Sequence, residues 1–400
     1  MHCAQKMTHN IYWIGSNDWT TERFENLFPI PNGVSYNSYF IDDEKTCVVD
    51  SVDAEIREEY FDNLTHLLNG RELDYIVVNH MEPDHCQTLL ETLERYPNCK
   101  MVGNATTFRM FEQFYNTPKP EQYHQIKEGD EICLGKHTLV SYTMPMVHWP
   151  EVTCTYEKST GTLFSADAFG TFGTVNGNIF ADQTDFVATY EEEARRYYTN
   201  IVGKFGMSVQ GLLKKAAGLE IRMICPLHSV IWREDLPWLI DKYLKWSSYT
   251  PEEKSVTIAY GSVYGHTEKA ADILAGKLAD RGIRHISVFD VSKTHPSYII
   301  ADAFRTSAMV FASITYNGGI FCNMDTLLHQ LAAHGLTNRT AALIQNGTWA
   351  ATTSKQMGEI LGTMKNIHVL EADVTIKSAL KNDQEAELDA LADAIAASLQ

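Results

Sequence analysis

Residues 254–400 alternate between short apolar segments and helical segments, and this rhythm limits the folds that they can adopt. Five of these segments are typical of buried strands: VTIAYGS, HISVFD, AMVFASITY, AALIQNG and IHVLEA. Between them the sequence predicts a helix over 266–280 and another near 297–304. A final helix would carry four aliphatic side chains on one face: Leu388, Leu391, Ile395 and Leu399. Strands that alternate with helices predict a parallel, doubly wound α/β sheet.

Residues 1–248 also combine strands and helices, but in a less regular order. Short strands follow one another from NSYFI to TLFSAD, and a long helical stretch, TYEEEARRYYTNIVGKF, precedes the buried strand IRMICPLH. A polar stretch, SSYTPEEKS (247–255), separates the two patterns and is the candidate linker. Because 400 residues exceed what one hydrophobic core usually supports, we expect two domains, over 1–249 and 254–400.

Charge and cysteine usage exclude several classes of protein. The formal net charge is -18, and residues 1–253 carry 37 acidic against 21 basic side chains. Nucleic acid and anionic membranes bind basic surfaces, so neither is expected as a partner. Eight cysteines occur singly, without a C-x-x-C pair, which is typical of reduced intracellular thiols and excludes a rubredoxin-like iron site in this sequence. With no signal-peptide pattern, we expect a cytoplasmic protein.

The strongest chemical signal is the run HMEPDH at 80–85. Directly after an apolar strand, it presents four potential metal ligands: His80, Glu82, Asp84 and His85. Four such groups beside a buried strand would lack charge balance unless they bind a metal. Three further candidates also follow apolar strands: His148, Asp167 and His228. We expect these strand ends to share one rim of a sheet, where the seven side chains would hold two metals with a bridging carboxylate.

The identity of the metal follows from the types of ligand. Zinc hydrolases with a similar layout have the run H-x-H-x-D-H, in which three imidazoles surround one ion. Here Glu82 stands in place of the middle imidazole, and Asp84 and Asp167 bring the number of carboxylates to three. Such an oxygen-rich set favours iron or manganese, and iron is the metal we expect.

Four motifs together resemble the flavodiiron (A-type flavoprotein) family. They are His80-x-Glu82-x-Asp84-His85, His148-Trp149-Pro150, Asp167-Ala168-Phe169-Gly170 and His228. The resemblance covers essentially the whole chain and implies an N-terminal metallo-β-lactamase-like αββα sandwich and a C-terminal flavodoxin-like domain. It implies one iron held by His80, Glu82 and His148, and a second held by Asp84, His85 and His228. In some relatives the histidine at the position of His85 does not touch the metal, so coordination by Asp84 and His228 without His85 is the alternative. Asp167 would bridge the two irons.

Two further positions follow from the resemblance. Cys86-Gln87 departs from the Ser-Gly of many relatives, which affects the start of the local helix rather than the ligands. Tyr197 corresponds to a tyrosine near the iron pocket of relatives, although packing of a helix would explain an aromatic residue there equally well.

Three strand ends in 254–400 carry loops that suit a flavin. The segment TIAYGSVYGHTEKAA resembles the flavodoxin phosphate loop S/T-x-T-G-x-T, with Tyr264 departing at the third position, and SITYNGGIF and QNGTWA follow later strands. No arginine or lysine precedes Lys269 in the phosphate loop and no G-x-G-x-x-G occurs, which favours FMN over a dinucleotide. We expect Trp349 to stack on the isoalloxazine, with a core position as the alternative. The residues expected at FMN are Ser262, Tyr264, Gly265, His266, Thr267, Thr315, Tyr316, Asn317, Gly318, Asn346, Gly347, Thr348 and Trp349.

A flavin joined to a two-iron site implies an oxidoreductase that reduces O2 to water, NO to N2O, or both. The family resemblance implies a head-to-tail homodimer, or a tetramer, in which each flavin faces the diiron site of a partner. The electron donor would be separate, such as rubredoxin or reduced F420. Two alternatives are a metallo-β-lactamase-type hydrolase, which Glu82 opposes, and a non-catalytic flavin electron carrier, which the complete ligand set opposes.

Overall fold

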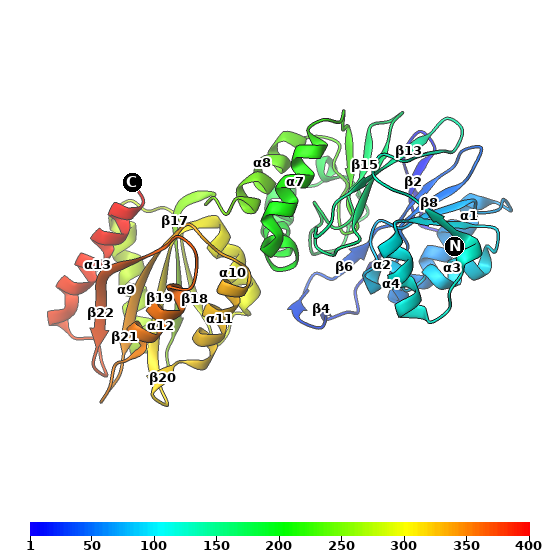
Figure 1. Ribbon diagram of the computed structural model, residues 1–400. Coiled ribbons are helices and arrows are strands. Elements are labelled where there is room, and N and C mark those ends of the chain that lie inside the picture. Colours follow the sequence, from blue (N-terminus) through cyan, green and yellow to red (C-terminus); the bar gives the residue numbers. More distant parts are fainter. The chain divides into compact units, whose positions relative to one another are not determined.

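The computed structural model describes all 400 residues, which pack as two compact units (Figure 1). The first unit consists of Met1–Tyr198 and Met207–Tyr243, and the second of Thr199–Gly206 and Leu244–Gln400. These limits run close to 1–249 and 254–400, whose assignment to a diiron domain and an FMN domain stays a prediction. None of the helices is both long enough and apolar enough to span a membrane.

Two sheets form the centre of the first unit. In spatial order, the seven-stranded sheet comprises β1 (Gln5–Thr8), β2 (Ile11–Trp13), β7 (Tyr39–Ile41), β8 (Cys47–Val49), β9 (Tyr75–Val77), β10 (Lys100–Gly103) and β11 (Tyr123–Gln125). The five-stranded sheet comprises β12 (Glu131–Cys133), β13 (Thr138–Thr143), β14 (Thr153–Glu157), β15 (Thr162–Phe164) and β16 (Met223–Cys225). Two short pairs complete the strands: β3 (Ser16–Asp18) with β6 (Val34–Tyr36), and β4 (Arg23–Phe24) with β5 (Phe28–Pro29).

The two sheets pack face to face. The ring of Tyr39 on β7 lies 5.1 Å from that of Phe164 on β15, measured between centroids. Every residue of β7, β8, β15 and β16 is buried, as expected of strands covered on both faces. The helices that belong mainly to this unit are α1 (Arg57–Leu68), α2 (Pro83–Cys86), α3 (Leu89–Arg95), α4 (Ala105–Tyr115), α5 (Phe186–Thr189), α6 (Glu191–Tyr197), α7 (Gly206–Ala216) and α8 (Leu236–Ser247). The predicted αββα sandwich of the metallo-β-lactamase type is confirmed.

A single parallel sheet forms the centre of the second unit. In spatial order, its main strands are β18 (Ile286–Asp290), β17 (Glu253–Gly261), β19 (Thr306–Tyr316), β21 (Arg339–Asn346) and β22 (Ile367–Ile376). All neighbours in this order pair in parallel, and the short β20 (Gly319–Ile320) folds back antiparallel on β19. In chain order this is the arrangement 2-1-3-4-5 of flavodoxin-like sheets, so the predicted doubly wound fold is confirmed.

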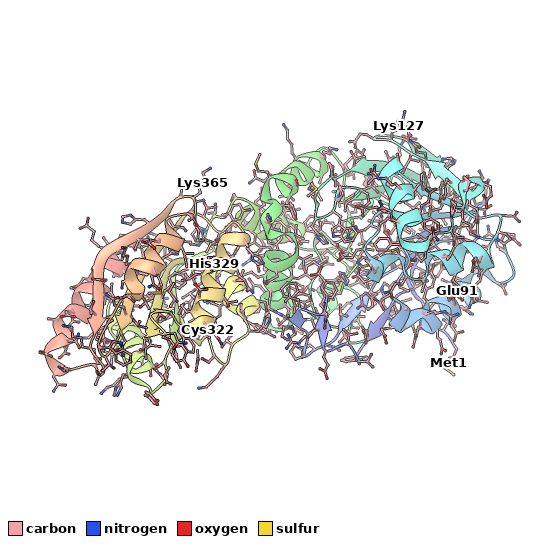
Figure 2. All side chains as sticks on the ribbon, turned by 60° about the horizontal axis from the view of Figure 1, so that its bottom comes forward. Met1, Glu91, Lys127, Cys322, His329 and Lys365 are labelled. Carbon is pink, nitrogen blue, oxygen red and sulfur yellow. The ribbon has the colours of Figure 1, made fainter.

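Helices cover both faces of this sheet (Figure 1). They are α9 (His266–Asp280) and α13 (Glu385–Ser398) on one face, and α10 (Pro296–Arg305), α11 (Cys322–Ala333) and α12 (Thr353–Leu361) on the other. Cys322 and His329 mark the position of α11 in Figure 2. The four aliphatic residues predicted on one face of the last helix are all buried in the core between α9, α13 and the strands.

The long helical stretch predicted before residue 217 is interrupted. Helix α6 ends at Tyr197, and a π-helix (Tyr198–Val202) and a 3-10 turn (Gly203–Phe205) separate it from α7. The π-helix and 3-10 turn also belong mostly to the second unit, whereas α6 belongs to the first. The apolar periodicity of the sequence does not reveal a single π turn, because a change from i→i+4 to i→i+5 bonding over a few residues is too short to alter the pattern of a longer window.

Candidate metal centre and flavin loops

The seven candidate ligands come from segments that follow four strands. His80 follows β9, whereas His148, Asp167 and His228 follow β13, β15 and β16. Strand β9 belongs to the seven-stranded sheet and the other three to the five-stranded sheet. The expectation of one rim on one sheet is therefore wrong, because the face-to-face packing of two sheets brings these ends together.

The run at 80–85 enters a helix at once. Glu82 is the N-cap of α2, Pro83 takes the first helical position, and Asp84 and His85 follow it. Proline suits that position because its missing N–H would have no partner in the first turn. The N–H of Gln87 donates to the carbonyl of Pro83 at 2.8 Å, so the departure from Ser-Gly leaves the helix start intact.

The first ligand group consists of His80, Glu82, His148 and Asp167, all buried. The Nε2 atom of His80 lies 3.2 Å from Glu82 Oε2 and 3.1 Å from Asp167 Oδ2. The Nε2 atom of His148 lies 3.0 Å and 3.1 Å from the same two oxygens. Two imidazole nitrogens and two carboxylate oxygens thus surround one point, which is a suitable arrangement for a divalent metal.

The second ligand group consists of Asp84, His85 and His228. Asp84 Oδ2 lies 3.2 Å from His85 Nε2 and 3.3 Å from His228 Nε2. Asp167 joins this group through its other oxygen, since Oδ1 lies 3.2 Å from His85 Nε2 and 3.6 Å from His228 Nε2. The carboxylate of Asp167 therefore directs one oxygen to each group.

The ligand atoms fit a pair of metal ions. The Nε2 atoms of His85 and His228 lie 3.1 Å apart. When both rings carry their hydrogen on Nδ1, the two Nε2 lone pairs face each other, and a bound cation would relieve this repulsion. The buried oxygens of Asp84 and Oδ1 of Asp167 accept no hydrogen bond. Buried carboxylates in this state are costly unless a cation neutralises them. Three carboxylates and four imidazoles form a set that suits two irons.

Without metal, the imidazoles and carboxylates balance one another's charge. Burial alone would lower the pKa of the histidines, but neighbouring carboxylates raise it to about 9 for His148 and about 10 for His85. Burial would raise the pKa of Asp167 and Asp84, but the neighbouring imidazoles hold both below the usual value. Metal ions must therefore displace protons from the imidazoles when they bind.

Strained backbone positions and a buried carboxylate orient several ligands. Ala166, directly before Asp167, has a φ of 53°, and Ser229, directly after His228, has a φ of 61°. Residues with a Cβ rarely adopt such conformations, and they persist where the surrounding structure requires them. Directly after β8, the buried Asp50 accepts the N–H of His80 through Oδ1 at 3.3 Å.

A pocket of about 370 Å³ opens onto the ligands. Glu82 and Asp84 line it together with Arg23, Glu25 and Tyr36. Burial raises the pKa of the Glu25 carboxyl to about 8, and the nearby Glu82 carboxylate adds to this rise. Glu25 is not predictable from the sequence, because no local motif marks it and only the folded β4–β5 turn brings it to the pocket.

Tyr197 lies close to the second ligand group. Its ring centroid is 5.4 Å from that of His228, its side chain is fully buried, and its hydroxyl has no hydrogen-bond partner. Burial raises the pKa of this hydroxyl well above its usual value, so it stays protonated. A role for Tyr197 at the metals stays a prediction.

The three predicted flavin loops lie at the carboxyl ends of neighbouring parallel strands. They follow β17, β19 and β21, which are adjacent in the sheet. Strand β17 is also where the chain order reverses, between β18 and β19, and ligands of such sheets bind at this switch point. In the first loop Gly265 has a φ of 85°, and its N–H donates to Ser262 Oγ at 3.1 Å.

Some of the residues predicted to bind FMN are exposed and others are buried. Trp349 and Tyr264 are 95% and 87% exposed, so the alternative of a core position for Trp349 is wrong. Thr267 and Asn346 are buried, and Asn346 Nδ2 donates to Thr267 Oγ1 at 3.3 Å, which joins the first and third loops. The remaining predicted residues lie in or beside these loops: Ser262, Gly265, His266, Thr315, Tyr316, Asn317, Gly318, Gly347 and Thr348.

The chain resembles known proteins along nearly its whole length. A family model described as ODP family beta lactamase matches residues 34–229. The anaerobic nitric oxide reductase flavorubredoxin of Escherichia coli (strain SMS-3-5 / SECEC) is 28% identical over 383 residues, covering 94% of this chain and 78% of that protein. Among solved structures, the rubredoxin oxygen:oxidoreductase of Desulfovibrio gigas has a TM-score of 0.92 at 27% identity, covering 99% of this chain and 98% of its own. The flavodiiron protein of Giardia intestinalis has a TM-score of 0.93 at 26% identity, covering 100% and 98%.

A double-sheet domain with two adjoining metal-ligand groups, followed by a flavodoxin-like domain, defines a class of two-metal flavoproteins. Within this class, the chain is similar along nearly its whole length to flavodiiron proteins.

Proposed function

We propose that this protein is an oxidoreductase that reduces O2 to water, NO to N2O, or both. The observation that carries the proposal is Asp167, whose two carboxylate oxygens are divided between two complete ligand groups. When bound, two irons and FMN supply the electrons that such a reduction consumes. The relatives named as a nitric oxide reductase and a rubredoxin:oxygen oxidoreductase support both substrates.

The side chains of the first unit have distinct roles in this proposal. His80, Glu82 and His148 hold one iron and Asp84, His85 and His228 the other, with Asp167 as the bridge. Glu25 and Tyr197 would carry protons at the pocket and beside the second group, because both reductions consume protons as well as electrons. Glu25 suits this role since its pKa of about 8 keeps it protonated near neutral pH before metal binds.

The loops after β17, β19 and β21 would hold FMN. The N–H groups at the start of α9 would face the phosphate, and Trp349, almost fully exposed, would cover the flavin ring. The donor would be a separate protein or cofactor, with rubredoxin favoured by the name of the Desulfovibrio gigas relative and reduced F420 as a further candidate. We further propose a head-to-tail homodimer or a tetramer in the cytoplasm.

Counting metal and flavin separates this function from its alternatives. The purified, reconstituted protein should contain two irons and one FMN per chain, and should consume O2 or NO when a reductant is supplied. Zinc without iron would support a metallo-β-lactamase-type hydrolase. Flavin without metal would support an electron carrier, and either result would contradict the proposal.

A further inference from the structure

The histidines of the two ligand groups differ in what their second ring nitrogen contacts. His80 Nδ1 lies 2.8 Å from Glu151 Oε1, whereas His228 Nδ1 lies 3.0 Å from the backbone carbonyl oxygen of Ser35. His85 Nδ1 is buried and has no partner. When Nε2 binds a metal, the ring hydrogen is on Nδ1, and the Nδ1 atoms of His80 and His228 can donate it to these acceptors. The first group is thus supported by a carboxylate, and the second only by a neutral carbonyl.

The structure holds Glu151 in place for this contact. Glu151 is 1% exposed, and its Oε1 also accepts the N–H of Met81 at 2.8 Å. Its backbone carbonyl accepts a hydrogen bond from Asn104 Nδ2 at 2.6 Å, and Asn104 caps the N-terminus of α4. Glu151 forms an ion pair with His80 through Oε1, and the Oε2 atom of Glu151 has no hydrogen-bond partner. The carboxylate is therefore directed at His80 and at no lysine or arginine.

A carboxylate that accepts the N–H of a ligating imidazole makes the imidazole a stronger electron donor to its metal. The first ligand group contains Glu82 and one oxygen of Asp167, and Glu151 adds a third anionic group behind it. The second group contains Asp84 and the other oxygen of Asp167, and no carboxylate accepts a hydrogen bond from Nδ1 of either of its imidazoles. The buried Asp50 carboxylate interacts electrostatically with His85, but its Oδ1 accepts the backbone N–H groups of Asn79 and His80 and does not contact a ring nitrogen of His85. More negative charge stabilises a trivalent ion more than a divalent one.

We propose that Glu151 makes the two metal positions unequal, so that the ion held by the first group binds more tightly and is oxidised first. Glu151 is a positioning residue in this scheme, since it acts through His80. The inference rests on the proposed diiron site but goes beyond it, because a diiron site does not require unequal positions. Each oxidation step is the transfer of one electron from one Fe²⁺, which becomes Fe³⁺, to an added oxidant such as ferricyanide.

The test compares Glu151→Gln with Glu157→Gln in the full-length protein loaded with iron. Gln keeps the shape at 151 and still accepts the His80 hydrogen, but it removes the charge. Glu157 is a matched control because it is also fully buried, yet it bonds to His137, Ser159 and Thr160 rather than to a ligand. A redox titration with ferricyanide, followed by electron paramagnetic resonance of the one-electron-oxidised state, measures both steps.

In Glu151→Gln we expect the potential of the first one-electron oxidation to rise towards that of the second. The one-electron-oxidised state should therefore be present over a narrower range of potentials than in the wild type. Affinity at the tighter position should fall by about 10–100-fold, the usual loss when the outer partner of a ligating histidine is removed. Glu157→Gln should titrate as the wild type does. Unchanged steps in Glu151→Gln, equal shifts of both steps, or the same shift in Glu157→Gln would overturn the inference. Wild-type protein that binds fewer than two irons would instead overturn the proposed function.

A second measurement does not depend on the stability of the Glu151 variant. Titration of the metal-free wild type with Co²⁺, followed by its visible absorption, should show two binding steps of unequal affinity. His148→Ala should abolish the tighter step and His228→Ala the weaker one. Two equal steps, or loss of the tighter step in His228→Ala, would contradict the inference even if Glu151→Gln fails to fold.

Discussion

Asp167 is the residue on which both ligand groups depend. Its Oδ2 faces His80 and His148, and its Oδ1 faces His85. A change at this position should therefore affect two metals, whereas a change at His228 should affect one. The number of metal ions lost in a variant of Asp167 and in a variant of His228 tests this difference.

We expect Asp167→Asn to retain less than about one iron per chain and His228→Ala to retain about one, because removing a ligand or its charge weakens a site roughly 10-fold or more. Elemental analysis after desalting measures both values, with the wild type as reference. Equal iron contents in the two variants would show that Asp167 does not serve both groups.

The imidazole protons make metal binding depend on pH. The pKa values of His148 and His85 in the metal-free protein are raised to about 9 and about 10, so both are protonated at neutral pH. Metal replaces these protons, and affinity should therefore rise with pH and level off above about pH 10. Competition with a chelator between pH 6 and pH 9, together with a pH indicator, measures the affinity and the protons released. Affinity that is flat across this range would contradict the assigned protonation states.

The seven metal ligands could be predicted from the sequence because each stands in a position that the sequence marks. Four of them stand within one run, and the other three each follow an apolar strand. Glu25 and Glu151 were not predicted, since each reaches the site only through contacts with residues far away in the chain. A carboxylate that accepts a hydrogen bond from a ligating histidine, as Glu151 does from His80, is not marked by any spacing in the sequence.

At the scale of elements, the loops after β17, β19 and β21 form one continuous edge because their strands are neighbours. Buried contacts such as Asn346 to Thr267 brace this edge, while Tyr264 and Trp349 project from it. A flat aromatic ligand such as a flavin ring would be held chiefly by the projecting aromatic rings.

Trp349→Ala should weaken FMN binding by about 10–100-fold, since stacking of an aromatic side chain contributes roughly 1–3 kcal/mol. Trp349→Phe keeps a ring at this position and should lose much less. Titration of the flavin-free protein with FMN, followed by quenching of flavin fluorescence, measures both affinities. Equal affinity of Trp349→Ala and wild type would exclude Trp349 from the flavin site.

The five main strands of the second unit and its helices α9, α10 and α13 were predictable from periodicity, and α9 has the predicted bounds 266–280, whereas α11 and α12 were not predicted. In the first unit, the predicted apolar segments correspond to β7–β10 and β13–β16, whereas β1–β6, β11, β12 and the division of the strands between two sheets were not predicted. Sheet membership depends on pairings between distant residues, such as β15 with β16, which period-2 patterns do not encode. The π-helix after α6 was not predicted either, because a single π turn is too short to change the apolar periodicity.

At the scale of the whole molecule, the proposed head-to-tail assembly makes each flavin serve the metal site of another chain. A metal-deficient variant, Asp167→Asn, and a flavin-deficient variant, Gly265→Val, would each be inactive alone. Valine is strained at Gly265 because the backbone φ there is 85°. Co-expression of the two variants should restore part of the activity, because a mixed dimer keeps one intact pair of flavin and metal site.

Differently tagged copies of the two variants should be purified together, which shows that mixed assemblies form. If these mixed assemblies are inactive, electron transfer from the flavin of one chain to the metal site of another is contradicted. Co-expression of Asp167→Asn with a second metal-deficient variant, His148→Ala, is the matched control and should remain inactive.

The central claim is that this protein reduces a diatomic gas at two irons with electrons from its flavin. The most direct measurement mixes the fully reduced protein, loaded with iron and FMN, with O2 or NO and follows flavin oxidation and gas consumption together. We predict that at least one gas is consumed as the flavin is oxidised, and that protein loaded with zinc and FMN is at least about 10-fold slower. If neither gas is consumed, or if the zinc-loaded protein reacts equally fast, the account is contradicted.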